Sequence, residues 1–252
     1  MIGHHAALFA AYAAALAGWA ALAARVPSLW SPVAPPTFRA PWREVAWALV
    51  ATAAVVTVGM TYSRGWLLPA TSTHRPALDV LNQLLIFSPY LLLLLIRRQR
   101  PDTAWLRTNG VPYRVAAGLA LALVALLIYA LVRTGIRSWP ALALSVYQPS
   151  HVSNCAQVLL EDIGIAILFV RIRAAMGLRW TLVLVAALFA AAHVPALLAA
   201  GAGPAELLPL LGDLCLGVAV LSVVQRSQDV WWFWMVHFAL DMTQFFPGAT
   251  AV

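Results

Sequence analysis

The sequence contains no lysine and little charge of either sign. Charged residues make up 10% of its 252 positions and hydrophobic residues 63%, whereas a typical soluble domain is about 25% charged. This composition excludes an ordinary water-soluble domain. The net charge of +7 comes from 16 arginines alone. Because these arginines fall between apolar runs, they are interpreted as determinants of membrane topology, and a nucleic-acid partner is not expected.

Cysteine is also scarce. Cys155 and Cys215 both lie inside apolar segments, which is typical of packing residues and gives no information about the redox compartment. The sequence shows no internal repeat and no low-complexity tail. It also lacks the His-Glu-x-x-His motif of zinc peptidases.

Long apolar runs, in contrast, recur along the whole chain. A helix of about 20 apolar residues spans a bilayer, so the sequence predicts an all-α integral membrane protein. We expect one membrane domain, a bundle of about eight transmembrane helices. The expected spans are 6–24, 44–62, 78–96, 115–132, 152–170, 181–200, 207–224 and 230–246.

The N-terminal half, residues 1–133, contains four of these spans and a proline-rich connector at 27–43. Dense prolines prevent a continuous helix, and Trp30 and Trp42 suit the lipid headgroup layer, which predicts an interfacial segment. Twelve of the 16 arginines follow odd-numbered spans. The positive-inside rule therefore predicts cytoplasmic arginine-rich loops and external termini. An alanine- and arginine-rich, lysine-free composition favours a multi-pass protein of a bacterial inner membrane.

Two adjacent carboxylates, Glu161 and Asp162, lie inside the fifth run. An ionisable side chain at mid-membrane costs at least about 2.5–3.5 kcal/mol, and two neighbouring like charges do not ionise together easily. A fold does not need such a pair, so we expect it to serve a function.

The partners expected for this pair lie at a matching depth. Glu161, His193 and His237 are ten, fourteen and eleven residues from an arginine at the same predicted face, which puts them roughly 15–22 Å from it. A carboxylate beside a neutral histidine can activate water, and a second histidine can donate to an oxyanion. Asp241 is four residues after His237 and could orient its ring. Alternatively, Glu161, His193 and His237 are of the types that bind zinc.

At these residues the chain resembles the CPBP family (CAAX protease and bacteriocin-processing, also called Abi), intramembrane endopeptidases that include type II CAAX prenyl proteases. The family carries Glu-Glu-x-x-x-Arg, Phe-x-x-x-His and His-x-x-x-Asn/Asp on successive helices. The second and third motifs stand here as Phe189-Ala-Ala-Ala-His193 and His237-Phe-Ala-Leu-Asp241. The first is degenerate, with Asp162 for the second Glu and Ala166 for the Arg. The resemblance covers residues 152–246, the CPBP-like catalytic core.

The resemblance implies a hydrolase, an intramembrane protease that cleaves a membrane-associated peptide or protein. It implies that Glu161 and His193 activate the attacking water, and that His237 with Asp241 stabilises the tetrahedral intermediate. Without the arginine, Asp162 would be held neutral by its surroundings. The mechanism requires no cofactor, with zinc as the alternative.

Two other functions fit the same residues. One is a catalytically inactive CPBP-like binding or immunity protein. The other is a proton-coupled transporter, because intramembrane carboxylates and histidines also form proton relays. A transporter often shows internal repeats, and the two halves of this sequence are not similar.

Overall fold

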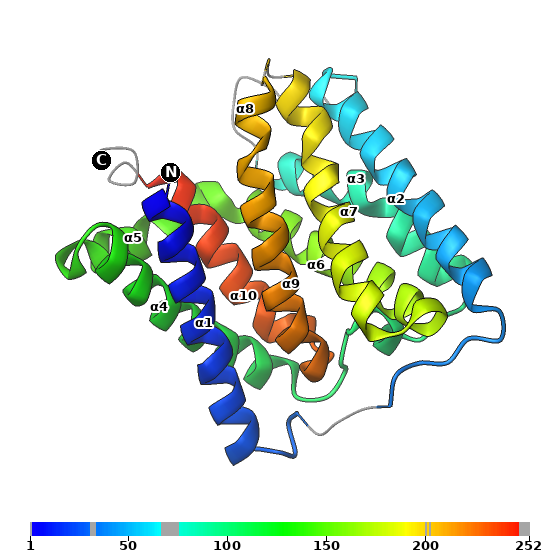
Figure 1. The fold of residues 1–252 in the computed structure, drawn as a ribbon, viewed down its shortest axis with the longest axis horizontal. Helices are drawn as coiled ribbons and strands as arrows, with labels where there is room; N and C mark the ends of the chain where they lie inside the picture. Colours follow the sequence, from blue (N-terminus) through cyan, green and yellow to red (C-terminus); the bar gives the residue numbers. More distant parts are fainter. Residues whose placement is uncertain (1, 31–33, 67–75, 200, 202, 247–252) are drawn as a thin grey trace. The chain divides into compact units, whose positions relative to one another are not determined.

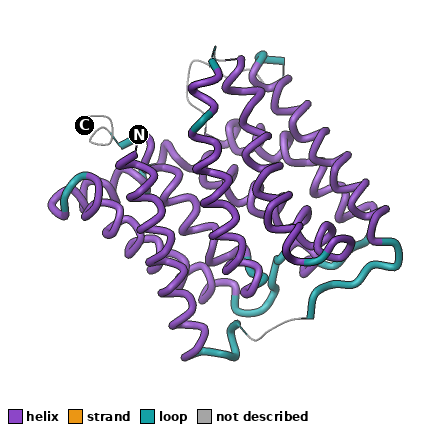
Figure 2. The backbone as a smooth tube through the Cα atoms, in the orientation of Figure 1, coloured by secondary structure: helices purple, strands orange, loops and turns teal. Residues whose placement is uncertain are grey.

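The computed structural model describes residues 2–30, 34–66, 76–199, 201 and 203–246. Over these residues the chain folds into ten α-helices and four short 3-10 helices, with no strand (Figures 1 and 2). The prediction of an all-α fold is confirmed.

Six helices are long and apolar enough to cross a membrane, which makes the chain a multi-pass integral membrane protein by the length and composition of its helices. These are α1 (Ile2–Arg25), α2 (Pro41–Ser63), α3 (Pro76–Ile96), α4 (Val111–Arg133), α7 (Leu178–Ala199) and α9 (Pro209–Ser227).

The predicted count of about eight spans is not supported. The fifth expected span is α6 (Val152–Met176), which has 25 residues but carries Glu161, Asp162 and two arginines and is not among the six. The eighth is α10 (Val230–Asp241), which has 12 residues. At ~1.5 Å per residue it extends ~18 Å, well short of the ~30 Å hydrocarbon core. The chain continues from α10 as the 3-10 helix η4 (Met242–Phe245).

The structure also differs from the prediction in the segments between the expected spans. The long helix α2 begins at Pro41, inside the predicted connector, because proline is tolerated in the first turn of a helix. Residues 31–33 of this connector lie outside the described residues. Five short helices lie in segments for which no helix is predicted: η1 (Pro101–Ala104), η2 (Ile136–Ser138), α5 (Trp139–Val146), η3 (Pro149–His151) and α8 (Pro204–Leu207).

The chain divides into two compact units, and each is discontinuous in sequence. The first takes residues 1–33, 107–159 and 223–252, and the second takes 34–106 and 160–222. Each unit therefore combines segments from both halves of the sequence. The proposed catalytic role of residues 152–246 concerns function and stays a prediction.

The first unit is built around α4, which packs against α1 and α10. Gly118 of α4 lies directly against the backbone of Trp232 in α10, so that a Cβ at this position would come within 2.7 Å of the Trp232 Cα. The Trp232 ring stacks on Trp19 of α1, with 5.4 Å between ring centroids. A glycine and two large rings thus hold three helices together.

The second unit contains the pair α2 and α3, which pack side by side, together with most of α6. Tyr90 of α3 connects them. Its hydroxyl lies 2.8 Å from the Thr52 hydroxyl of α2, and its ring lies against Gly164 of α6, where a Cβ would be 2.5 Å from the ring.

Candidate functional site

The acidic pair lies on the part of α6 that belongs to the second unit. Asp162 is 3% exposed, and its neighbours Leu160 and Ile163 are buried apolar residues, whereas Glu161 is partly exposed. Adjacent helical residues point about 100° apart, which explains how two neighbours meet different surroundings. Glu161 therefore reaches the surface of the second unit, whereas Asp162 does not.

The helix face that carries Glu161 continues one turn later at Gly164. Residues three apart share a helix face, and Gly164 is the point at which the Tyr90 ring approaches α6. Tyr90, held through its hydroxyl by Thr52, therefore packs against α6 within one turn of Glu161.

His193 lies near the end of α7, and its side chain is exposed. Its Nδ1 is 2.9 Å from the carbonyl oxygen of Phe189, and the two rings are 4.9 Å apart. The carbonyl can only accept, so Nδ1 donates to it, and in the neutral ring Nε2 is then an acceptor. The two named residues of the second motif therefore contact each other, and their contact uses Nδ1 rather than Nε2 of His193.

His237 and Asp241 lie on α10 in the first unit, and both are partly exposed. The His237 ring stacks on Phe233 at 5.5 Å. The Asp241 carboxylate accepts a hydrogen bond from the Gln244 side-chain amide at 3.0 Å. The expected orientation of His237 by Asp241 stays a prediction.

The candidate residues are thus divided between the two units: Glu161, Asp162 and His193 belong to the second, and His237 and Asp241 to the first. Their convergence on one cavity stays a prediction. No three His, Cys, Asp or Glu side chains gather as metal ligands within the described part of the chain. Zinc binding by Glu161, His193 and His237 is likewise still a prediction.

Ala166, which stands in place of the family's arginine, is fully buried. The next arginine, Arg171, is also fully buried, and its guanidinium is engaged elsewhere. It donates to the carbonyl oxygens of Ile167 (2.8 Å) and Thr103 (3.3 Å) and to the Gln99 side chain. Arg171 therefore links the last part of α6 to Gln99 and Thr103, and it does not replace the missing arginine.

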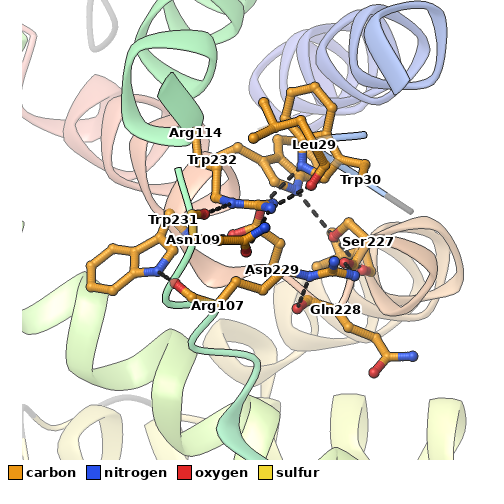
Figure 3. Close-up of polar contacts among 11 residues, drawn as sticks. Leu29, Trp30, Arg107, Asn109, Arg114, Ser227, Gln228, Asp229, Trp231 and Trp232 are labelled. Atoms are coloured by element: carbon orange, nitrogen blue, oxygen red, sulfur yellow. Dashed lines mark hydrogen bonds and ion pairs between the residues drawn. The ribbon is translucent and has the colours of Figure 1, made fainter. Parts of the chain in front are cut away.

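Sequence reasoning missed a buried ion pair in the first unit (Figure 3). Arg114 of α4 and Asp229, which precedes α10, are both fully buried and are joined at 2.6 Å between Nη1 and Oδ2. Arg114 also donates to the carbonyl oxygens of Asn109 (2.7 Å) and Leu29. The Trp30 indole donates to the same Asp229 oxygen at 2.9 Å. This pair ties the segment after α1 to the starts of α4 and α10.

The second Asp229 oxygen caps α10 by accepting from the Trp231 backbone N–H at 3.0 Å. Burial raises the pKa of Asp229, while Arg114, Trp30 and Trp231 act in the opposite direction. An Asp before an apolar helix is an N-cap signal that the sequence does contain. Nothing in the sequence distinguishes Arg114 from an exposed arginine of a topology-determining loop.

A second missed cluster lies in the second unit. Glu44 at the start of α2 is buried and binds Arg97 (2.5 Å) and the Gln99 amide (2.6 Å), both just after α3. Gln99 in turn binds Arg171 of α6. The starting turn of α2 is thus joined to the ends of α3 and α6.

Comparisons of the chain with known protein families, with curated proteins and with solved structures found no match. The resemblance to the CPBP family, which is based on three short sequence motifs, stays a prediction.

Proposed function

We propose that the protein is an intramembrane endopeptidase, acting on a membrane-associated peptide or protein, in a bacterial inner membrane. The observation that carries this proposal is the acidic pair in α6. Asp162 is buried among apolar side chains, and its neighbour Glu161 is partly exposed. Placing two carboxylates in an apolar helix costs free energy. A catalytic role of Glu161 in peptide hydrolysis explains why such a pair is present.

In the proposed mechanism Glu161 removes a proton from the water that attacks the peptide carbonyl. The Nε2 atom of His193 accepts a hydrogen bond from the same water, which orients it. His237 donates to the oxyanion of the tetrahedral intermediate, and Asp241 orients His237. The intermediate collapses with cleavage of the peptide C–N bond, and the protonated Glu161 returns its proton to the leaving amine nitrogen. These steps need no cofactor. If zinc were bound by Glu161, His193 and His237, it would supply a metal-activated water at the same position.

One observation favours a second candidate, a catalytically inactive relative that acts by binding. Ala166 is fully buried where the family has an arginine, so no cation lies at that position to stabilise an ionised second carboxylate. In this case Glu161 could be replaced without loss of function.

The test is cleavage of membrane-derived peptides by the purified protein in detergent, with new peptide ends identified by mass spectrometry. Glu161→Gln should reduce turnover about 10²–10⁴-fold, the usual contribution of a general base. Asp213→Asn in α9 changes an acidic residue outside the proposed mechanism and is the matched control, expected to keep activity. Equal activity of the wild type and Glu161→Gln, or no cleavage by either, would contradict the proposal.

A further inference from the structure

One end of the second unit is held by a continuous set of polar and aromatic contacts. Glu44 binds Arg97 and Gln99, and Gln99 binds Arg171. The Arg171 guanidinium also lies over the Phe38 ring, 5.6 Å from its centroid. The segment before α2, the segment after α3 and the last part of α6 therefore meet at the same end of this unit (Figure 1).

Arginines with exposed side chains flank this buried set. Consecutive Cα atoms are ~3.8 Å apart, so the direct sequence neighbours of the set must lie at the same end. Four of these neighbours are exposed arginines: Arg39 beside Phe38, Arg43 beside Glu44, Arg98 beside Arg97 and Arg100 beside Gln99.

The charge of this end is strongly positive. Residues 34–47 and 97–106 contain five arginines and two acidic residues, which leaves a net charge of +3. Both acidic residues are already bound to arginines, Glu44 to Arg97 at 2.5 Å and Asp102 to Arg100 at 3.1 Å. Arg39, Arg43 and Arg98 thus present their charge toward the outside of the unit.

An aromatic ring accompanies these charges. Trp42, next to Arg43, is 61% exposed at the start of α2. Tryptophan is enriched at the headgroup level of membranes, because its ring is apolar and its N–H is polar. A tryptophan exposed among arginines, at the end of a helix long enough to cross a membrane, suits a lipid surface better than a water-soluble anionic partner.

We propose that this surface, formed by Arg39, Trp42, Arg43 and Arg98, binds the phosphate groups of anionic phospholipids. The guanidinium fork matches the geometry of a phosphate and binds it through two parallel hydrogen bonds. The buried contacts below the surface hold the backbone of Arg43 and Arg98 in place. Lipid binding therefore costs little backbone conformational entropy. The occupant is a headgroup within the bilayer, and this inference is independent of the peptidase proposal.

The test measures the melting temperature of the full-length protein in a neutral detergent during titration with short-chain phosphatidylglycerol. Phosphatidylcholine and inorganic phosphate are titrated in parallel. Phosphatidylglycerol should raise the melting temperature with saturation, and the other two should not. The shift should shrink at about 1 M salt, where exposed charges are screened beyond ~3 Å.

The variant Arg39→Gln/Arg43→Gln should lose at least half of this shift. Its matched control is Arg64→Gln/Arg137→Gln, which removes two exposed arginines located elsewhere, at the end of α2 and in η2. The control should keep the full shift. If the first variant fails to fold, Arg98→Gln alone should still lose part of the shift.

Three results would overturn the proposal. An equal shift with phosphatidylcholine would show that charge plays no part. An equal shift with inorganic phosphate would replace the lipid with a soluble anion. A full shift in both the Arg39→Gln/Arg43→Gln and Arg98→Gln variants would place the binding elsewhere.

Discussion

Arg114 and Asp229 form an ion pair with both side chains fully buried, whereas Arg100 and Asp102 form one in which the arginine is 84% exposed. Removing one partner of a buried pair leaves an uncompensated charge and typically costs about 3–5 kcal/mol. An exposed pair typically contributes about 0–1 kcal/mol. The two pairs therefore predict very different effects of the same substitution.

Asp229→Asn should lower the free energy of unfolding by about 3–5 kcal/mol, and Asp102→Asn by less than about 1 kcal/mol. The measurement is denaturant unfolding of the two variants in mixed micelles. Similar effects of both substitutions would show that the Arg114–Asp229 pair does not hold the first unit together.

The two carboxylates of α6 should also differ. Asp162 is buried and Glu161 is partly exposed, so Glu161 is the carboxylate assigned as the base in the proposed mechanism. Asp162→Asn keeps the size of the side chain and one of its oxygens. It should reduce peptide cleavage much less than Glu161→Gln, which should cost about 10²–10⁴-fold. Kinetics of both purified variants check this. If Asp162→Asn were as damaging as Glu161→Gln, the assignment of the base would be wrong.

At the scale of helices, two glycines allow a controlled test of packing. A Cβ on Gly118 of α4 would collide with the Trp232 backbone, which cannot rotate away, whereas a Cβ on Gly59 of α2 would meet only Ile86 at 3.8 Å. Gly118→Ala should therefore destabilise the protein by about 1–3 kcal/mol through overpacking. Gly59→Ala should be neutral or stabilise it by up to about 1 kcal/mol, because alanine favours the helix.

Thermal unfolding of the two glycine variants distinguishes these effects. A stable Gly118→Ala variant would contradict the close approach of α4 and α10.

The helix positions that the sequence predicts best are those of α2, α3 and α4. Their long apolar runs end at polar or proline residues, so their bounds differ by only a few residues from the predicted spans. The last helix shows where this reasoning fails. Hydropathy does not register that α10 ends at Asp241 and continues as a 3-10 turn, so the predicted span at 230–246 is too long.

At the scale of the whole molecule, the sequence could not reveal the division into two units. Hydropathy and helical periodicity are local, whereas each unit joins segments that are far apart in the chain. The same limit applies to the site. The motifs name Glu161, His193 and His237, but the buried roles of Arg114 and Arg171 depend on partners 115 and 72 residues away.

The arginine distribution predicts a topology that can be measured. Reporter fusions after Arg64 and after Arg100, on either side of α3, should give opposite signals, with Arg100 cytoplasmic. Arg75, in the same predicted external loop as Arg64, lies outside the described residues. Identical signals at Arg64 and Arg100 would show that α3 does not cross the membrane.

The most direct test of the central claim is whether Glu161, His193 and His237 meet at one site in the membrane-embedded protein. In a background with Cys155→Ala and Cys215→Ala, cysteines are introduced in pairs at 161 and 193 and at 161 and 237. They are then treated with a short bifunctional thiol reagent. Both pairs should cross-link rapidly, while a control pair at 161 and 174, which lie about 20 Å apart along α6, should not. Failure of either proposed pair to cross-link in a folded protein would contradict the proposed active site.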